Sequence, residues 1–384
     1  MITYKFRLYP KKAEVEKLEI AKEVCRQTYN YLLAELNEGY TKNEIQNFLL
    51  DLKVVNPQMD NVHSKVLQME NQRLFGNLSS LSQRKKQGHK VGRLRFKGKN
   101  WFKTFTYNQS GFSLTHLKAK KGILWLSKIG EIPIKLHRQV EGNIKSITIK
   151  KSLGRWYASV VTDNVIKRVC GIGEIGIDVG IENYIYDSDG NAYENPKHFD
   201  NYHQELKIAQ QSLSKKEKRS NSRIKARIKV AKIHERIANA RDDFIHKLST
   251  KLIKENKFIA IEKLNIKNLI GISYNAKNIA DASWGKLSMY LHYKAENAGC
   301  VVQDVDPAYT TRDCNFCGHR NRKLFLWQRQ FCCEKCNGEL PRDYNSAINI
   351  LVRGKELASL EKASNTGQLV QQVASMKAEA TTST

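Results

Sequence analysis

The sequence predicts a multidomain α/β protein in which a small β-barrel carrying a helical insertion precedes a mixed α/β domain. Three observations lead to this prediction. Runs of alternating apolar and polar residues, typical of half-buried strands, lie on both sides of a stretch with helical periodicity. After Cys170, short apolar runs alternate with helical patterns, as in layered α/β domains. Two C-x-x-C pairs near the C-terminus indicate a small metal-bound module.

Residues 11–85 are predicted to form the helical domain. Apolar residues recur every three or four positions from Lys11 to Leu36, as on one face of a long helix. Thr41-Lys-Asn-Glu44 matches the capping box that begins a second helix, because its side chains satisfy free backbone N–H groups. The apolar spacing from Val62 to Leu78 predicts a third helix.

The strands on either side of the helical domain are predicted to form one split barrel. Ile2–Leu8 alternates apolar and polar residues, and Pro10 ends the run. Several short alternating runs follow between Phe105 and Val161, separated by turn residues. We expect the N-terminal strand to join them, so that residues 1–10 and 86–168 make up the β-barrel.

From Cys170 onward the pattern predicts the mixed α/β domain. Ile175-Gly-Ile-Asp178 and Phe258-Ile-Ala-Ile-Glu262 are short buried strands that each end in an acid. A basic helical insertion lies between them, at about residues 202–254. The expected boundaries are 169–310 and 338–355 for the α/β domain, 311–337 for the metal-bound module, and 356–384 for a tail of little periodicity that is expected to be disordered.

The net charge restricts the partners of the chain. Its 384 residues include 65 Lys and Arg against 38 Asp and Glu, so the formal charge is +27. An excess of this size repels itself unless a polyanion covers it, which favours nucleic acid over an anionic membrane surface. We expect a cytoplasmic, nucleoid-associated protein without a membrane partner. No apolar run approaches the length of a membrane span, and the N-terminus lacks the pattern of a secretory signal.

Four cysteines have the spacing of a zinc site. Cys314 and Cys317 form one C-x-x-C pair, and Cys333 and Cys336 form another. Four thiolates around one tetrahedral Zn²⁺ leave no open coordination position, so this zinc would be structural. Cys332 is an alternative to Cys333 that would give a C-x3-C pair with Cys336, and the C-x-x-C spacing favours Cys333. A set of buried cysteines without metal is the less specific interpretation.

Three acids are candidate ligands of catalytic metal ions. Asp178, Glu262 and Asp343 each lie beside an apolar segment that should be buried, where an unpaired carboxylate is costly. Together they could hold two Mg²⁺ ions for phosphodiester hydrolysis. Each acid also has a structural alternative. Asp178 could cap a turn, Glu262 could pair with a lysine, and Asp343 could cap the helix that follows it.

These motifs resemble those of TnpB, a family of transposon-encoded RNA-guided DNA endonucleases regarded as relatives of the type V CRISPR effectors. Their order and approximate spacing agree over nearly the whole chain. The matching segments are Tyr4–Pro10, which looks like the family's N-terminal strand; Gly176–Gly180, Ile261–Asn265 and Arg342–Asn349, which are similar to its three RuvC motifs; and Cys314–Cys336, which resembles its zinc ribbon.

The resemblance implies a RuvC-like nuclease lobe of the RNase H fold, interrupted by the zinc ribbon, and a wedge β-barrel with a helical recognition insertion. It implies that Asp178, Glu262 and Asp343 are the nuclease carboxylates, with Mg²⁺ as the catalytic metal. It also implies cleavage of double-stranded DNA beside a short motif, at a site chosen by pairing with a guide RNA from the transposon end. No small-molecule substrate is expected.

Two alternatives remain open under this resemblance: an RNA-guided DNA-binding repressor that does not cleave, and a compact type V CRISPR effector. All three carboxylates and all four paired cysteines are present, which favours an active nuclease. Pro341 stands where many relatives carry another acid. A transposase that breaks and joins strands itself ranks last, because no tyrosine-nucleophile or His-hydrophobe-His site stands out.

Two basic stretches, Arg84–Lys103 and Lys215–Lys232, are the candidate contacts to guide RNA and target DNA. Proteins hold such nucleic acids through phosphate charge and backbone shape. A solvated basic face is the alternative. Trp101, Phe102 and Tyr107 could stack on unpaired bases or belong to the barrel core. The candidate nucleic-acid-binding residues are Arg84, Lys85, Lys86, Lys90, Arg93, Arg95, Lys97, Lys99, Arg223 and Arg227.

Overall fold

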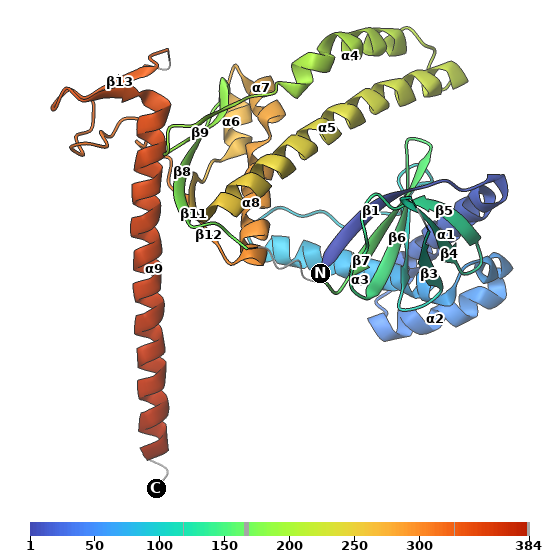
Figure 1. The fold of residues 1–384 in the computed structure, drawn as a ribbon. Helices are drawn as coiled ribbons and strands as arrows, with labels where there is room; N and C mark the ends of the chain where they lie inside the picture. The colour runs from blue at the N-terminus through green and yellow to red at the C-terminus, as the bar shows by residue number, and fades with distance from the viewer. Residues whose placement is uncertain (118, 165–168, 326, 382–384) are drawn as a thin grey trace. The chain divides into compact units, whose positions relative to one another are not determined.

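The computed structural model describes residues 1–117, 119–164, 169–325 and 327–381 (Figure 1). The chain forms two compact units, Met1–Ile166 and Lys167–Thr384. The predicted boundary at residue 168 lies outside the described residues. No helix within the described ranges is long and apolar enough to cross a membrane.

A seven-stranded antiparallel sheet forms one part of the first unit. Its middle strand is β1, which pairs with β5 on one side and β7 on the other, so the N-terminal strand joins the later strands as predicted. Only residues 109–111 connect the two edge strands, β2 and β3, which brings the two edges together at one corner. Full closure into a barrel remains a prediction. The strands are β1 (Ile2–Leu8), β2 (Thr104–Asn108), β3 (Phe112–His116), β4 (Lys121–Leu126), β5 (Gly130–Lys135), β6 (Ile144–Ser152) and β7 (Arg155–Thr162).

The predicted helices form the other part of the first unit. The capping box of Thr41 and Glu44 begins α2 as predicted. Buried side chains of the helices and of the sheet belong to one continuous hydrophobic core, so the predicted helical domain and barrel are packed together. The helices are α1 (Lys12–Asn37), α2 (Lys42–Val55), the short 3-10 helix η1 (Pro57–Asn61) and α3 (Ser64–Lys86).

The second unit is built on a five-stranded mixed sheet of order β10-β9-β8-β11-β12. β8, β11 and β12 are parallel, whereas β9 and β10 run antiparallel. Apolar side chains of α5 and α8 pack on one face, and α9 packs on the other (Figure 1). The strands are β8 (Gly173–Val179), β9 (Asn183–Asp187), β10 (Ala192–Glu194), β11 (Asn256–Glu262) and β12 (Val301–Val305).

The helices of the second unit include the predicted insertion, which is a hairpin of α4 and α5 with a small core of its own. β13 and β14 form a two-stranded sheet in the cysteine-rich segment between β12 and α9. The elements are α4 (His198–Ser214), α5 (Asn221–Glu255), α6 (Ile266–Ile272), α7 (Ala276–Ala282), α8 (Trp284–Ala298), β13 (Gln330–Cys332), β14 (Glu339–Pro341) and α9 (Arg342–Thr381).

The expected disordered tail at residues 356–384 differs from the structure. α9 continues through Thr381, and residues 382–384 lie outside the described residues. Ala, Leu, Glu, Lys and Gln together make up just over half of this segment, with Ser and Thr among the rest, and it contains no proline. Residues of high helix propensity extend a helix that packing has already started, which weak apolar periodicity does not reveal.

Candidate active site and zinc site

The three predicted carboxylates lie at the carboxyl ends of the parallel strands of the five-stranded sheet. Ile177 of β8 pairs with Ile261 of β11, so Asp178 and Glu262 come one residue later on adjacent parallel strands. Side chains alternate along a strand, and the two acids therefore share one face of the sheet. Asp343 lies in the first turn of α9, the helix that covers this face.

Gly176 explains why α9 can lie so close to the sheet. A Cβ atom at this position would be 2.1 Å from the carbonyl oxygen of Ala347 and 2.6 Å from the amide nitrogen of Leu351. The backbone of α9 therefore rests directly on β8, two residues before Asp178. This contact is what brings the first turn of α9, with Asp343, to the carboxyl ends of the strands.

The pKa shifts indicate that the three acids influence one another. Burial raises the pKa of Asp178 well above its usual value, and the negative charges of Glu262 and Asp343 raise it further. Burial likewise raises the pKa of Glu262, although a hydrogen bond from Thr310 and the charge of Arg353 lower it. Buried carboxylates that repel one another favour either a shared proton or a bound cation.

Asp343 pairs with a cationic side chain. The guanidinium of Arg342 lies 3.1 Å from Oδ1 of Asp343. Among the described residues, the group that gathers three or more ligand atoms within 4.8 Å of one another is the four-cysteine cluster. The three carboxylates thus share one end of the sheet, but their oxygen atoms do not all lie within 4.8 Å of one another.

The predicted zinc ligands do come together. Sγ of Cys314 lies 3.7 Å from Sγ of Cys336, and Sγ of Cys317 lies 3.6 Å from Sγ of Cys333. Sulfurs around a tetrahedral zinc with Zn–S bonds of about 2.3 Å are spaced by about 3.8 Å, so these thiols fit Zn²⁺. Cys332 is exposed and lies outside the cluster, which favours Cys333 as the ligand.

Backbone groups shape this thiol cluster. The amide N–H groups of Lys335 and Cys336 donate to Sγ of Cys333, and these donors lower the pKa of that thiol to about 6. Gly338 packs against the ring of Phe316, which a Cβ atom at residue 338 would approach to 2.6 Å. Both features are typical of a tight turn around a thiolate-bound metal.

The predicted nucleic-acid-binding residues have different surroundings. Arg84, Lys85 and Lys86 end α3 and are exposed, as are the basic residues that follow up to Lys99, except the half-buried Lys97. Arg227 is exposed on α5, whereas the guanidinium of Arg223 donates to the carbonyl oxygens of Leu213 and Lys216. Arg223 therefore satisfies the C-terminal end of α4, a task that a count of basic residues does not reveal.

The aromatic residues of the basic stretch divide between surface and core. Trp101 is 84 % exposed and remains able to stack on a base. Phe102 and Tyr107 are buried, and the hydroxyl of Tyr107 donates to the carbonyl oxygen of Ser127. These two residues therefore belong to the hydrophobic core, which was the alternative to base stacking.

One basic surface was not predicted. On the outer face of the seven-stranded sheet, cross-strand pairs join Lys150 to Tyr157, Tyr157 to Arg7, Arg7 to Lys135, and Lys135 to Lys121. We call these five residues the transverse basic row. The lysines are exposed. Each occupies an outward position of an alternating run, but only the strand register shows that they form one line.

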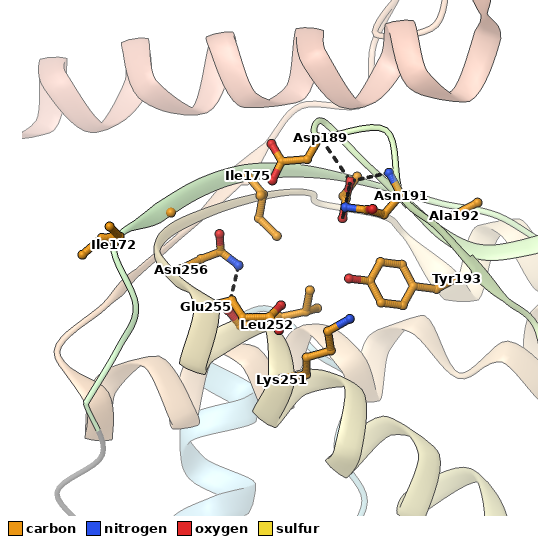
Figure 2. A pocket seen from close by; sticks show the side chains of 12 residues that line it. Ile172, Ile175, Asp189, Asn191, Ala192, Tyr193, Lys251, Leu252, Glu255 and Asn256 are labelled. Atoms are coloured by element: carbon orange, nitrogen blue, oxygen red, sulfur yellow. Dashed lines mark hydrogen bonds between the residues drawn. The ribbon is translucent and has the colours of Figure 1, made fainter.

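A separate cavity of about 590 Å³ lies at the opposite end of β8 (Figure 2). Tyr193 and Lys251 lie side by side along it, with Nζ of Lys251 4.8 Å from the centre of the Tyr193 ring, and Asn191 and Asp189 line its upper side in this view. Gly173, at the start of β8, also lines it, five residues or about 17 Å along the strand from Asp178. This cavity is not part of the carboxylate site.

Comparisons with known proteins place the chain in a family. A family model described as "Probable transposase" (OrfB_IS605) matches residues 163–273, and a model of the Cas12f1-like TNB domain matches residues 284–350. A helix-turn-helix model matches residues 1–44. The chain is 30% identical over 304 residues to "Putative RNA-guided DNA endonuclease InsQ" of Escherichia coli, covering 75% of this chain and 73% of the relative. The chain belongs to the TnpB family.

Other TnpB-family relatives and solved structures agree. A Streptomyces pristinaespiralis protein named "Putative RNA-guided DNA endonuclease" is 35% identical over 65% of this chain and 62% of the relative. A TnpB-like protein of Methanocaldococcus jannaschii is 29% identical over 48% of this chain and 69% of the relative. The fold is similar to Cas12f1 in its complex with sgRNA and target DNA, at a TM-score of 0.59, 16% identity and coverage of 89% of this chain and 83% of that chain.

Proposed function

We propose that this TnpB-family chain is an RNA-guided DNA endonuclease of an insertion-sequence element. It would cleave double-stranded DNA that is complementary to a guide RNA transcribed from the transposon end, next to a short motif. The observation that carries the proposal is the meeting of Asp178, Glu262 and Asp343 at one end of the sheet. The names of relatives that match most of the chain support it.

The second unit would be a RuvC-like nuclease lobe of the RNase H fold. The strand order supports this, because β10, β9 and β8 are antiparallel neighbours, β8 then pairs in parallel with β11, and β11 pairs in parallel with β12. One acid ends each of β8 and β11, and the third begins the covering helix. The sheet of the first unit would be the wedge barrel, with α1 to α3 as its recognition insertion.

Asp178, Glu262 and Asp343 would hold catalytic Mg²⁺ ions, in agreement with the oxygen ligands that Mg²⁺ prefers. Bound Mg²⁺ lowers the pKa of a water molecule and stabilises charge on the leaving oxygen. The chain itself supplies carboxylates whose pKa is raised by burial and, for Asp178, by the neighbouring negative charges, a repulsion that a bound cation would offset. Arg342 pairs with Asp343, so this guanidinium would release the carboxylate when the site is loaded.

The four-cysteine cluster would bind a structural zinc ion, since its thiols fill all four tetrahedral positions. The nucleic-acid partners would contact basic surfaces such as the transverse basic row and the exposed residues between Arg84 and Lys99. Phosphate contacts of this kind are sequence-independent, which suits a protein whose target is chosen by base pairing.

The test is to co-express the chain with transposon-end RNA, sequence the RNA that co-purifies, and challenge the complex with a matched plasmid library in Mg²⁺. We expect a discrete RNA and cleavage beside one short motif. Asp178→Ala should abolish cleavage and keep RNA binding, whereas Asp243→Ala, an exposed acid on α5, should change neither. Full cleavage by Asp178→Ala would refute the assignment.

An RNA-guided repressor that binds DNA without cutting is the second candidate. The ion pair between Arg342 and Asp343 is the observation that suggests it, because in a repressor this guanidinium would keep the carboxylate from a metal ion. A discrete RNA and target binding without cleavage, together with restored cleavage in Arg342→Gln, would support this reading. A repeat array beside the gene would instead indicate a compact CRISPR effector.

A further inference from the structure

Thr310 holds one of the proposed catalytic carboxylates. Its hydroxyl donates to Oε1 of Glu262 at 2.6 Å. The side chain of Thr310 is 1 % exposed, and its residue lies in the turn after β12, four residues before Cys314. A hydrogen bond to a charged oxygen in a buried place is stronger than a neutral one and fixes the orientation of its acceptor.

α9 holds the same turn from the other side. The side-chain amide of Asn349 donates to the carbonyl oxygens of Thr310 at 2.9 Å and Asp313 at 2.6 Å. Asn345, one helical turn earlier, donates to the same carbonyl of Asp313 and accepts from the backbone N–H of Asn315 at 3.1 Å. Both asparagines are buried. Residues 310–315 are therefore fastened to the helix that carries Asp343.

The zinc module fastens the far end of this turn. The N–H of Cys314 donates to the carbonyl oxygen of His319, and the N–H of Gly318 donates to that of Cys314. The carboxylate of Asp313 bridges the guanidinium groups of Arg320 and Arg353. The backbone around Cys314 is thus linked both to the first cysteine pair and, through Thr310, to Glu262.

We propose that Thr310 is a positioning residue that fixes the orientation of Glu262 and links it to the zinc-bound module. The hydroxyl donates to Oε1 of Glu262, so Oε2 would be the oxygen that binds a metal ion. Glutamate has three rotatable bonds, so without this bond its carboxylate would sample several orientations. The proposal rests on the proposed role of Glu262 as a Mg²⁺ ligand.

The test uses the full chain and measures binding of Mn²⁺, a spectroscopic substitute for Mg²⁺, by electron paramagnetic resonance. Thr310→Val removes the donor at nearly constant volume, and Thr310→Ser keeps it. Thr28→Val is the matched control, since Thr28 is also 1 % exposed but its hydroxyl has no partner among the described residues. We expect Thr310→Val to weaken Mn²⁺ binding about tenfold, Thr310→Ser less than about twofold, and Thr28→Val not at all.

The link to zinc is tested by a double-mutant cycle. Cys317→Ser should weaken both zinc and Mn²⁺ binding, and Cys317→Ser combined with Thr310→Val should lose less Mn²⁺ affinity than the product of the separate losses. Independent losses would overturn the link. Zinc lost from Thr310→Val alone would overturn the positioning role, because Thr310 would then support the module itself.

The failure of this inference can be told from the failure of the proposed function. Glu262→Gln is the reference variant for both. If Glu262→Gln weakens Mn²⁺ binding and Thr310→Val does not, the positioning role is wrong and the metal role of Glu262 stands. If Glu262→Gln leaves Mn²⁺ binding unchanged, the proposed metal site fails, and the inference about Thr310 fails with it.

Discussion

Gly176→Ala is expected to separate the third carboxylate from the other two. The new Cβ atom would lie 2.1 Å from the carbonyl oxygen of Ala347, about 1 Å closer than such contacts occur. Its second neighbour, the amide nitrogen of Leu351, is also backbone, so no side-chain rotation relieves the clash. α9 must therefore move away from β8, and Asp343 moves with it.

The magnitude follows from the cost of overpacking, which is typically about 1–3 kcal/mol. Because both neighbours belong to a helix backbone, we expect the upper end, about 3 kcal/mol, or roughly a hundredfold more frequent local opening. Global melting is a poor assay, because two units do not unfold as one two-state system. Hydrogen exchange of peptides from α9 and β8 measures the local change, with peptides from the first unit as the internal reference.

Gly76→Ala is the matched control. It lies within α3, and a Cβ atom there meets nothing within 4 Å. Alanine is favoured over glycine in a helix by up to about 1 kcal/mol, so this variant should exchange as slowly as the parent or more slowly. Unchanged exchange in α9 of Gly176→Ala, or full DNA cleavage by it, would refute the idea that this glycine sets the position of Asp343.

Three further outcomes are expected. The raised pKa of Asp178 means that the folded state holds this proton more tightly, so the stability of the metal-free second unit should fall as pH rises above about 4. Asp178→Asn should flatten that pH dependence, measured as the protection of β8 peptides from hydrogen exchange. Cys333→Ser should abolish zinc binding measured by elemental analysis, whereas Cys332→Ser should keep one zinc per chain. Lys135→Ala and Lys150→Ala should each reduce, by about one, the slope of the logarithm of RNA affinity against the logarithm of salt concentration. An unchanged slope would show that the transverse basic row does not contact RNA.

The sequence was informative where a local pattern has one physical cause. Alternation fixes which side chains of Ile2–Leu8 face the core, and the acids at the ends of two apolar strands mark one edge of a sheet. Membership of the TnpB family also follows from the order of the motifs, and the comparisons confirm it. Cys314, Cys317 and Cys336 belong to a spacing that few other sites share.

Features that depend on contacts between two segments far apart in the sequence could not be predicted from local patterns. Spacing favours Cys333 as the ligand but leaves Cys332 as an alternative, and the geometry of the β13–β14 turn places Cys333 in the cluster. Strand register, which aligns the transverse basic row, is absent from any single alternating run. Arg223 looks like any other basic residue until the end of α4 is placed beside it. Each of these outcomes is decided by tertiary contacts.

The four-cysteine cluster also lies within the connection that brings Asp343 to Glu262, and the size of each contribution indicates how a bound zinc would act. Thirty-six residues connect β12 to α9, and a zinc ion that joins Cys314 to Cys336 would shorten the effective path to fifteen. Loop-closure entropy changes by only about 0.8 kcal/mol for this shortening. Buried hydrogen bonds contribute about 1 kcal/mol each or more, and several join the segment around Cys314 to α9 and Glu262. Zinc would therefore support the carboxylates mainly by holding these donors in place, and its loss should weaken divalent-ion binding before it unfolds the sheet.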